Sequence, residues 1–177
     1  MGTVVGRCVA SGHEISKLCQ ILKERRSRSV VLNLYGKHYH NIDAKGRLSV
    51  PAKFREVLGS SLVIAISPDN CLRIYSSEQF DQVIAKLEED VDTSSDEGRL
   101  FFDFFTSNAS SCEIDTQGRI IVPPALRDYA GIKKEVVVVG AGKRADVWDK
   151  DTYEERFGDM DKDKFKSFIA NNKLRLG

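Results

Sequence analysis

The chain repeats itself at an offset of 72 residues. The segment DAKGRLSVPAKFR at 43–55 matches DTQGRIIVPPALR at 115–127, with Asp, Gly, Arg, Val, Pro and Arg in the same places. After a slip of one residue the match continues, with LVIAI at 62–66 against EVVVV at 135–139. Two units are too few for a solenoid, which needs at least three repeats. We therefore expect the two halves to pack together as one pseudo-symmetric domain.

Each copy predicts a tight turn between two strands. In the first copy a strand over 38–42 enters the turn and a strand over 48–50 leaves it. Asp43 suits the first turn position because its carboxylate can accept a nearby backbone N–H, and Gly46 can take the positive φ that the fourth position often needs. The second copy carries the equivalent turn residues, Asp115 and Gly118. This chemistry predicts a β-hairpin in each half.

A short helix and two strands follow each turn. Pro51 suits the first position of a helix over 52–58, and Gly59 suits its C-terminal end. Apolar strands are expected at 62–66 and 71–75. The second copy has its helix signals at Pro123, Pro124 and Gly131. The predicted fold class is α+β and mainly β.

Two longer helices are expected between the copies. Ser76 and Gln79 have the spacing of a capping box at the start of the first. In the second, LFFDFFTSNA at 100–109, an aromatic face is formed by Leu100, Phe101, Phe104 and Phe105. Such a face can bind a partner, but a stripe at helical spacing is more often core, and we expect core here. The acidic stretch 88–98 is expected to be a solvated connection.

The formal net charge of +1 is an average of unlike segments. Residues 1–34 carry +4 and residues 35–177 carry −3. Within the second range, 35–56 is +3 and 115–134 is +2, whereas 69–103 is −7. Because counterion release depends on local phosphate contacts, a body of net negative charge can still bind nucleic acid through a basic edge.

Alternation after each turn places one arginine outward in each copy. Leu48 and Val50 share one face of their strand, so Arg47 points to the other, and Arg119 does so in the second copy. One interpretation is that each arginine only pairs with the aspartate of its own turn and holds the hairpin. The other is a nucleic-acid contact, favoured by neighbouring cations that the turn does not need, namely Lys45, Lys53 and Arg55.

Several classes of protein are disfavoured by the sequence. No apolar run approaches the roughly 18–20 residues that span a bilayer, and the first residues lack the apolar core of a secretory signal. The cysteines at 8, 19, 71 and 112 form no CxxC pair, so a zinc site has little support and reduced thiols are expected. We expect no cofactor, bound metal or small-molecule substrate, and no membrane partner.

An enzyme remains the weakest alternative. VVVVGAGKRA at 136–145 contains a G-x-G-x-x-A pattern after a strand, as in a dinucleotide-binding turn. The following residues, DVWDKDTY, lack the long amphipathic helix that carries the pyrophosphate. A hairpin explains this turn better, and the sequence lacks G-x-S-x-G, Walker A and HExxH motifs.

The doubled DxxxR motif, with a proline four residues after each arginine, resembles the MraZ family of bacterial transcriptional regulators. The match runs from about Asn33 to Tyr153, and includes GKHYHNID before the first motif and VVVVGAGKRADVWD after the second. The resemblance implies a pseudo-two-fold, double-psi-like barrel of two AbrB-like swapped-hairpin units. It divides the chain into a leader (1–32), a first unit (33–80), a helical connector (81–109), a second unit (110–157) and a C-terminal helical tail (158–177).

The resemblance also implies a function. Members form ring-shaped homo-oligomers and bind short G-containing direct repeats in double-stranded DNA upstream of the division and cell-wall gene cluster, usually including their own gene. Carried over by position, the DNA-contacting residues are Arg47 and Arg119, with Lys45 as a close assistant. A cytoplasmic, nucleoid-associated repressor is expected. Gln117 occupies the position in the second copy that Lys45 occupies in the first. The first unit is therefore expected to make most of the phosphate contacts.

Two further alternatives concern the chain ends. Residues 1–32 have no counterpart in the family. They are either a basic helical extension or a translated leader upstream of a non-AUG start at Val30, Val31 or Leu32, and we favour the latter. AbrB-like units also serve as antitoxins that bind a partner through a tail, and Phe165, Phe168 and Ile169 cluster at helical spacing in such a segment. The fused double motif favours the regulator.

Overall fold

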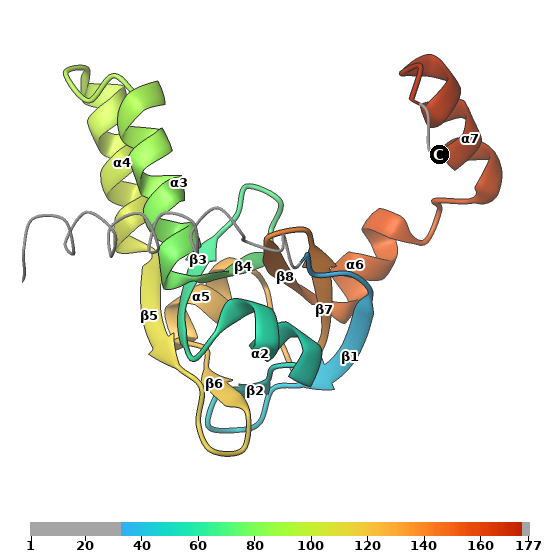
Figure 1. Cartoon of the computed structure of the whole chain (residues 1–177), viewed down its shortest axis with the longest axis horizontal. Coiled ribbons are helices and arrows are strands. Elements are labelled where there is room, and N and C mark those ends of the chain that lie inside the picture. Colours follow the sequence, from blue (N-terminus) through green and yellow to red (C-terminus); the bar gives the residue numbers. More distant parts are fainter. Residues whose placement is uncertain (1–32, 175–177) are drawn as a thin grey trace, which may run out of the picture. The chain divides into compact units, whose positions relative to one another are not determined.

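The computed structural model describes residues 33–174, in which the chain forms the strands and helices labelled in Figure 1. The strands are β1 (Lys37–Asn41), β2 (Arg47–Ser49), β3 (Ser61–Ile66), β4 (Leu72–Ser76), β5 (Ala109–Glu113), β6 (Arg119–Ile121), β7 (Glu135–Ala141) and β8 (Arg144–Asp149). The helices are α2 (Ala52–Leu58), α3 (Ser77–Asp90), α4 (Asp96–Ser107), α5 (Pro124–Tyr129), α6 (Lys150–Phe157) and α7 (Lys162–Asn171). Residues 1–32, interpreted above as a leader or an extension, lie outside the described residues. None of these helices is long and apolar enough to cross a membrane.

The first turn forms as predicted, but the strands beside it do not pair with each other. The backbone N–H of Asp43 donates to the carbonyl of Arg47 over 3.1 Å, and Gly46 has a φ of 77°. β1 then pairs with β7 of the second half, and β5 pairs with β3 of the first half. The predicted hairpins are therefore wrong beyond the turns. Turn chemistry reverses the chain, whereas burial of the apolar face selects the partner strand.

The strands that leave the two turns pair with each other. β2 and β6 run antiparallel, with Leu48 opposite Ile120. Both side chains are at most 1% exposed. The backbone N–H of Val50 donates to the carbonyl of Gly118, and that of Val122 donates to the carbonyl of Gly46. Each turn is thus bonded to the residue that directly follows β2 or β6 in the opposite half.

The sheet order has the pseudo-symmetry that the repeat predicts. The larger sheet runs β1-β7-β8-β4-β3-β5 and is antiparallel throughout. Exchanging each strand with its counterpart in the other half, β1 with β5 through β4 with β8, gives the same order in reverse. The fold is α+β, and the halves share one set of strand pairs.

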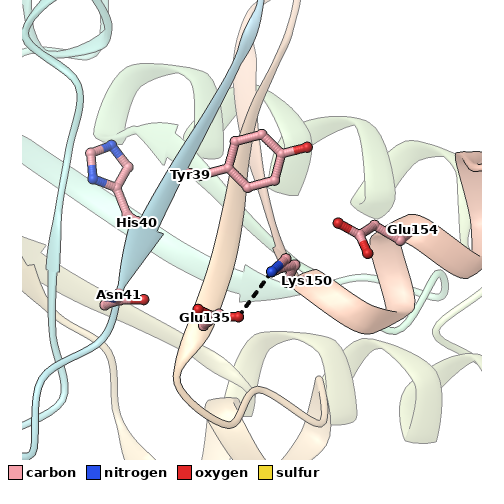
Figure 2. A pocket seen from close by; sticks show the side chains of 6 residues that line it. All are labelled: Tyr39, His40, Asn41, Glu135, Lys150 and Glu154. Carbon is pink, nitrogen blue, oxygen red and sulfur yellow. Dashed lines mark hydrogen bonds and ion pairs between the residues drawn. The ribbon is translucent and has the colours of Figure 1, made fainter.

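The helix α6 lies against the β7–β8 side of the larger sheet. The side chain of Lys150, its first residue, donates to Glu135 at the start of β7 over 3.0 Å (Figure 2). Phe157 at its other end contacts Trp148 of β8 edge to face, with 5.7 Å between ring centroids. The helix is therefore fixed to the body at both ends.

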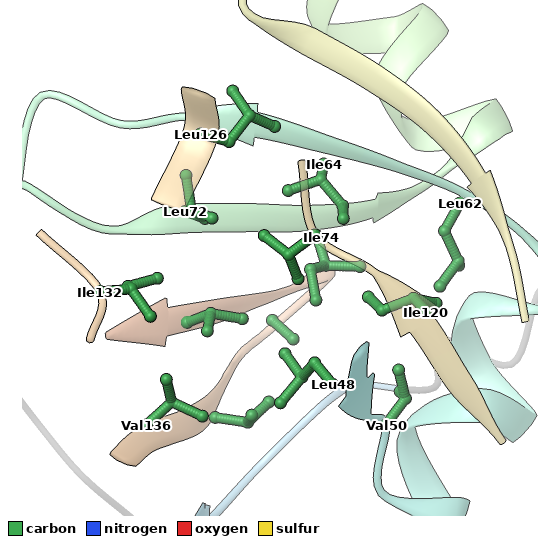
Figure 3. Packing of buried hydrophobic residues seen from close by; sticks show 14 of the residues in the cluster. Leu48, Val50, Leu62, Ile64, Leu72, Ile74, Ile120, Leu126, Ile132 and Val136 are labelled. Carbon is green, nitrogen blue, oxygen red and sulfur yellow. The ribbon is translucent and has the colours of Figure 1, made fainter. Parts of the chain in front are cut away.

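The hydrophobic core draws on both halves of the chain. Residues from β2, β3 and β4 meet residues from β6, β7 and β8 in a single cluster (Figure 3). Ten labelled members of the cluster are Leu48, Val50, Leu62, Ile64, Leu72, Ile74, Ile120, Leu126, Ile132 and Val136. Because neither half could bury these side chains alone, the duplicated halves are expected to fold cooperatively.

Local signals for the connector helices are confirmed only in part. α4 ends at Ser107, short of the predicted end at Ala109, and only residues 91–95 of the acidic stretch 88–98 lie between the two helices. Ser76 accepts from the backbone N–H of Gln79, whose side chain accepts in return, so the capping box is present. The expectation that the aromatic face of α4 is core is wrong. Leu100 is 72% exposed and Phe101 is 50% exposed, while Phe105 packs against the core. The apolar face of α4 therefore contacts the core only near Phe105, and the part of this face nearer the start of the helix is exposed to solvent.

Smaller differences concern the short helices. Pro51 and Pro123 are the N-cap residues of α2 and α5, one position before the predicted first turn for Pro51. Gly59 ends α2 with a φ of 80°, as predicted.

Cys71 and Cys112 are free thiols, and burial raises the pKa of each to about 11. Cys8 and Cys19 lie outside the described residues.

Candidate nucleic-acid interface

The paired strands β2 and β6, with the two turns beside them, form a small ribbon at one edge of the body (Figure 1). Leu48 and Ile120 point inward, so the alternate positions face outward. The outward side chains are Arg47, Ser49, Arg119 and Ile121. Arg47 stands opposite Ile121, which is 61% exposed, and Arg119 stands opposite Ser49.

The two arginines predicted from the separate copies lie together on this ribbon. Arg47 and Arg119 are diagonal neighbours on one face of an antiparallel pair, a relationship that puts Cβ atoms within about 7–8 Å. The sequence predicted that each points outward, which is confirmed. It did not predict that they share a face, because that follows from strand pairing across the halves.

Asp43 organises the first turn through both oxygens of its carboxylate. Oδ1 accepts from the backbone N–H groups of Lys45 and Arg47, each over 2.9 Å. Oδ2 accepts from Nε of Arg47 over 2.6 Å. The backbone N–H of Arg47 is the main cause that lowers the pKa of Asp43, and the guanidinium lowers it further. Among the described residues, Asp43 uses Nε of Arg47 and neither Nη has a hydrogen-bond partner.

Asp115 organises the second turn in the same way, with one difference. Oδ1 accepts from the backbone N–H groups of Gln117 and Arg119. Oδ2 accepts from Nε of Arg119 over 3.0 Å and also from one Nη over 2.8 Å. The backbone N–H of Arg119 and then its side chain lower the pKa of Asp115. The guanidinium of Arg119 therefore donates two hydrogen bonds to its aspartate, whereas that of Arg47 donates one.

The helix arginines of the two copies cross over to the opposite turn. A Cβ added at Gly118 would lie 2.8 Å from Cζ of Arg55, and one at Gly46 would lie 3.5 Å from an Nη of Arg127. The Nε atoms of Arg55 and Arg127 are both buried, without a hydrogen-bond partner among the described residues. Its place in the chain predicts that Arg55 belongs to the basic edge of the first unit. In the structure it lies against the turn of the second.

Arg127 was not selected from the sequence, although a signal was present. It is the last matching residue of the repeated motif, 72 positions after Arg55. The remaining predicted cations, Lys45 in the first turn and Lys53 on α2, are exposed. The structure thus brings Arg47 and Arg119 together, and exchanges Arg55 and Arg127 between the turns. Because each turn is packed against an arginine of the other half, the net charges of segments 35–56 and 115–134 do not give the charge around either turn.

A concave surface, separate from the ribbon, lies between β1 and α6 (Figure 2). It is a cavity of about 500 Å³ lined by Tyr39, His40, Asn41, Glu135, Lys150 and Glu154. Its lysine is already paired with Glu135, whose hydrogen bond raises the pKa of Lys150. Across residues 33–174, no group of three or more His, Cys, Asp and Glu side chains is arranged to hold a metal ion.

The G-x-G-x-x-A pattern lies in a hairpin. Ala141 of β7 stands opposite Arg144 of β8, and Gly142 between them has a φ of 74°. A strand antiparallel to β7 therefore follows the glycines, where a dinucleotide-binding turn requires a helix. The hairpin interpretation of this turn is confirmed.

The chain is similar to known proteins along most of its length. A family model described as "MraZ protein, putative antitoxin-like" matches residues 34–102 and again residues 105–175. The chain belongs to the MraZ family. The two matches fall on the two copies of the repeat, so the family's own unit corresponds to one half of the crossed fold.

Individual MraZ relatives match most of the chain. A protein named transcriptional regulator MraZ from Acetivibrio thermocellus is 44% identical over 125 residues, which is 71% of this chain and 87% of the relative. Those of Desulforamulus reducens and Ligilactobacillus salivarius, which carry the same name, are 42% and 44% identical over 136 residues, or 77% of this chain and 94% of each relative.

Proposed function

We propose that this chain is a transcriptional regulator that binds double-stranded DNA through the exposed face of the β2–β6 ribbon. The observation that carries the proposal is the diagonal placement of Arg47 and Arg119 on one rigid, solvent-facing surface. The name transcriptional regulator, carried by its MraZ relatives, supports it. The turns are braced by their own aspartates and by the opposite half, so the arginines are presented with little freedom.

The ribbon has the chemistry and dimensions of a major-groove reader. A two-stranded ribbon fits the major groove of B-DNA, and an arginine fork can bond O6 and N7 of guanine at once. Each such contact contributes about 1–3 kcal/mol of discrimination between bases. Arg47, whose Nη groups are uncommitted among the described residues, is the primary contact. Lys45, Lys53 and Arg55 add positive charge near the phosphates.

Recognition of repeated sites requires more than one ribbon. The chain acts as a ring-shaped homo-oligomer that binds short G-containing direct repeats. These repeats lie upstream of the division and cell-wall gene cluster, which includes its own gene. There the protein represses transcription, as a cytoplasmic protein associated with the nucleoid. Several ribbons on several repeats gain affinity by raising the effective concentration of each later contact. The gain depends on a match between repeat spacing and subunit spacing.

The crossed strand pairing supports the finer fold assignment. β1 and β2 enter and leave one turn yet pair with β7 and β6 of the other half, as expected for two interlocked swapped hairpins in a double-psi-like barrel. In this assignment the AbrB-like units are residues 33–80 and 110–157, joined by the connector 81–109.

Substitution of Arg47 tests the proposal. In a gel-shift assay on DNA from upstream of the chain's own gene, Arg47→Ala abolishes specific binding, because every subunit loses its primary base contact. The control is Arg99→Ala, which removes an arginine that is likewise paired with a nearby aspartate but lies on α4. Unchanged affinity of the Arg47→Ala protein for this DNA would refute the proposal.

An antitoxin is the alternative that the family description favours. In that role α7 would bind a second protein. Co-purification of a small toxic protein with the full chain, abolished by substitution of Phe165 and Phe168, would favour this role over the regulator.

A further inference from the structure

The helices α3 and α4 carry an apolar surface that the core does not cover. Leu100, Phe101 and Phe104 of α4 are 72%, 50% and 49% exposed. Beside them lies a cavity of about 280 Å³ whose apolar walls include Val83, Leu87, Phe101, Phe104, Phe105 and Tyr129. This volume is just below the roughly 300–1,000 Å³ of small-molecule sites. We call the cavity and the exposed side chains of α4 the α4 groove.

A second uncovered apolar surface lies at the other end of the chain. Helix α7 exposes Phe165 by 50% and Phe168 by 57%, with Ile169 half-buried beside them. Their spacing of three and four residues places them on one face of the helix. Two uncovered apolar surfaces of this kind on a single chain are typical of interaction sites.

The two surfaces have opposite charge. Residues 77–107, which include α3 and α4, hold nine acidic residues against Lys86 and Arg99, a net charge of −7. Residues 162–174, which include α7, hold four lysines against Asp163, a net charge of +3. Glu97 and Asp103 lie three positions before and after Leu100, so they flank the groove on the face of α4 that carries it.

The position of α7 along the chain directs it away from the groove of its own subunit. α6 is fixed to β7 and β8, and four residues separate it from α7. The groove belongs to helices that contact β3, β4 and β5, at the other side of the larger sheet. A helix that continues from the β7–β8 side is therefore placed to reach another molecule.

We propose that α7 of one copy docks in the α4 groove of a second copy. Phe165 and Phe168 cover the exposed side chains of α4, and the lysines of α7 face the carboxylates that flank the groove. The two surfaces differ, so the contact is head-to-tail, and a head-to-tail contact that closes on itself makes a ring. The inference rests on the self-association in the proposed function and names the surfaces responsible for it.

A mixing experiment with two full-length variants tests this interface. One variant carries Phe165→Ser and Phe168→Ser, and the other carries Leu100→Ser and Phe104→Ser. By analytical ultracentrifugation without DNA, the unsubstituted chain is an oligomer and each variant alone is a monomer. An equimolar mixture forms a one-to-one dimer and nothing larger, because each such pair has one intact α7 facing one intact groove. Circular dichroism of each variant checks that the body is folded.

Several outcomes would overturn the interface. They are a monomeric unsubstituted chain, which would place α7 on its own chain, an unchanged oligomer in either variant, or a mixture of the two variants that stays monomeric. The control is Tyr35→Ser, which removes an aromatic side chain that is 71% exposed outside both surfaces and must keep the parent mass. DNA binding is measured separately, so a folded oligomer that ignores DNA would refute the proposed function and leave this interface standing.

Discussion

The guanidinium of Arg55 lies against Gly118, although the two residues belong to opposite halves of the repeat. A Cβ at Gly118 would stand 2.8 Å from Cζ of Arg55, closer than real Cβ contacts, and Gly118 has a φ of 77°. The pseudo-symmetric contact joins Arg127 to Gly46. Gly118 therefore has two functions: it allows the positive φ and it leaves room for an arginine from the other half. At Gly46 an added Cβ would be crowded by the carbonyl of Val122 at 3.0 Å, while Arg127 stays at ordinary contact distance.

Gly118→Ala is expected to destabilise the protein more than a glycine substitution that meets strain alone. Positive φ costs an L residue about 1–2 kcal/mol. The added Cβ must also displace the guanidinium of Arg55, and because this is the far end of a flexible side chain the extra cost is at the low end of overpacking, about 1 kcal/mol. The control is Gly36→Ala, where φ is 89° and nothing lies within 4 Å of the added Cβ. Urea denaturation measures both free energies of unfolding.

The double variant Arg55→Ala with Gly118→Ala isolates the contact. The extra destabilisation caused by Gly118→Ala should shrink when Arg55 is already alanine, since the guanidinium is gone. Equal effects of Gly118→Ala in both backgrounds would show that Arg55 does not limit the space at this turn.

The crossed contacts predict that each helix arginine stabilises the turn of the other half. In Arg127→Ala, hydrogen–deuterium exchange should speed up in the turn over 43–47, and in Arg55→Ala it should speed up over 115–119. The reason is that each guanidinium packs on the distant turn glycine. An effect confined to the turn of the same half in both variants would contradict the crossed arrangement.

The sequence predicted local elements well and partners poorly. The turn at Asp43, the capping box at Ser76 and the outward direction of Arg47 depend on a few neighbouring residues, and all three are present. The pairing of β1 with β7 depends on burying apolar faces across about 100 residues of chain, which turn chemistry does not encode. For the same reason the sequence does not predict that Arg55 crosses to the second turn.

The prediction that the apolar face of α4 is core was wrong for a different reason. Leu100 and Phe104 have the spacing of a core stripe, and the pattern is the same for a helix that packs on its own chain and one that packs on another. Only the structure separates these cases, through the exposure of both side chains.

The two ribbon arginines are expected to be unequal. Among the described residues, Asp43 engages only Nε of Arg47, whereas Asp115 engages Nε and one Nη of Arg119. Arg47 thus keeps the guanidinium edge that reads guanine. In gel shifts Arg47→Ala should weaken specific binding more than Arg119→Ala, and Arg47→Lys should retain nonspecific binding, since lysine keeps the charge but lacks the fork. Greater damage from Arg119→Ala would reverse this assignment.

Folding stability should depend on pH through the turn aspartates. Hydrogen bonds from Arg47 lower the pKa of Asp43 in the folded protein, relative to about 3.9 in an unfolded chain. The contribution is present above this unfolded value and is lost as the pH falls through the folded pKa. Asp43→Asn should therefore flatten the fall of the unfolding free energy below about pH 4. An acid limb that is as steep in the Asp43→Asn protein as in the parent would show that this pairing does not contribute.

Lys45 is expected to act through charge rather than base recognition. It lies exposed in the first turn, next to the ribbon that carries Arg47. If it neutralises one phosphate per subunit, Lys45→Ala reduces the slope of log affinity against log salt by about 0.9 for each phosphate that is no longer neutralised. Affinity for operator and unrelated DNA should fall by the same factor, whereas Arg47→Ala should reduce the ratio between them. Lys86→Ala, an exposed lysine on α3, is the matched control. A changed operator preference in Lys45→Ala would instead identify Lys45 as a base-reading residue.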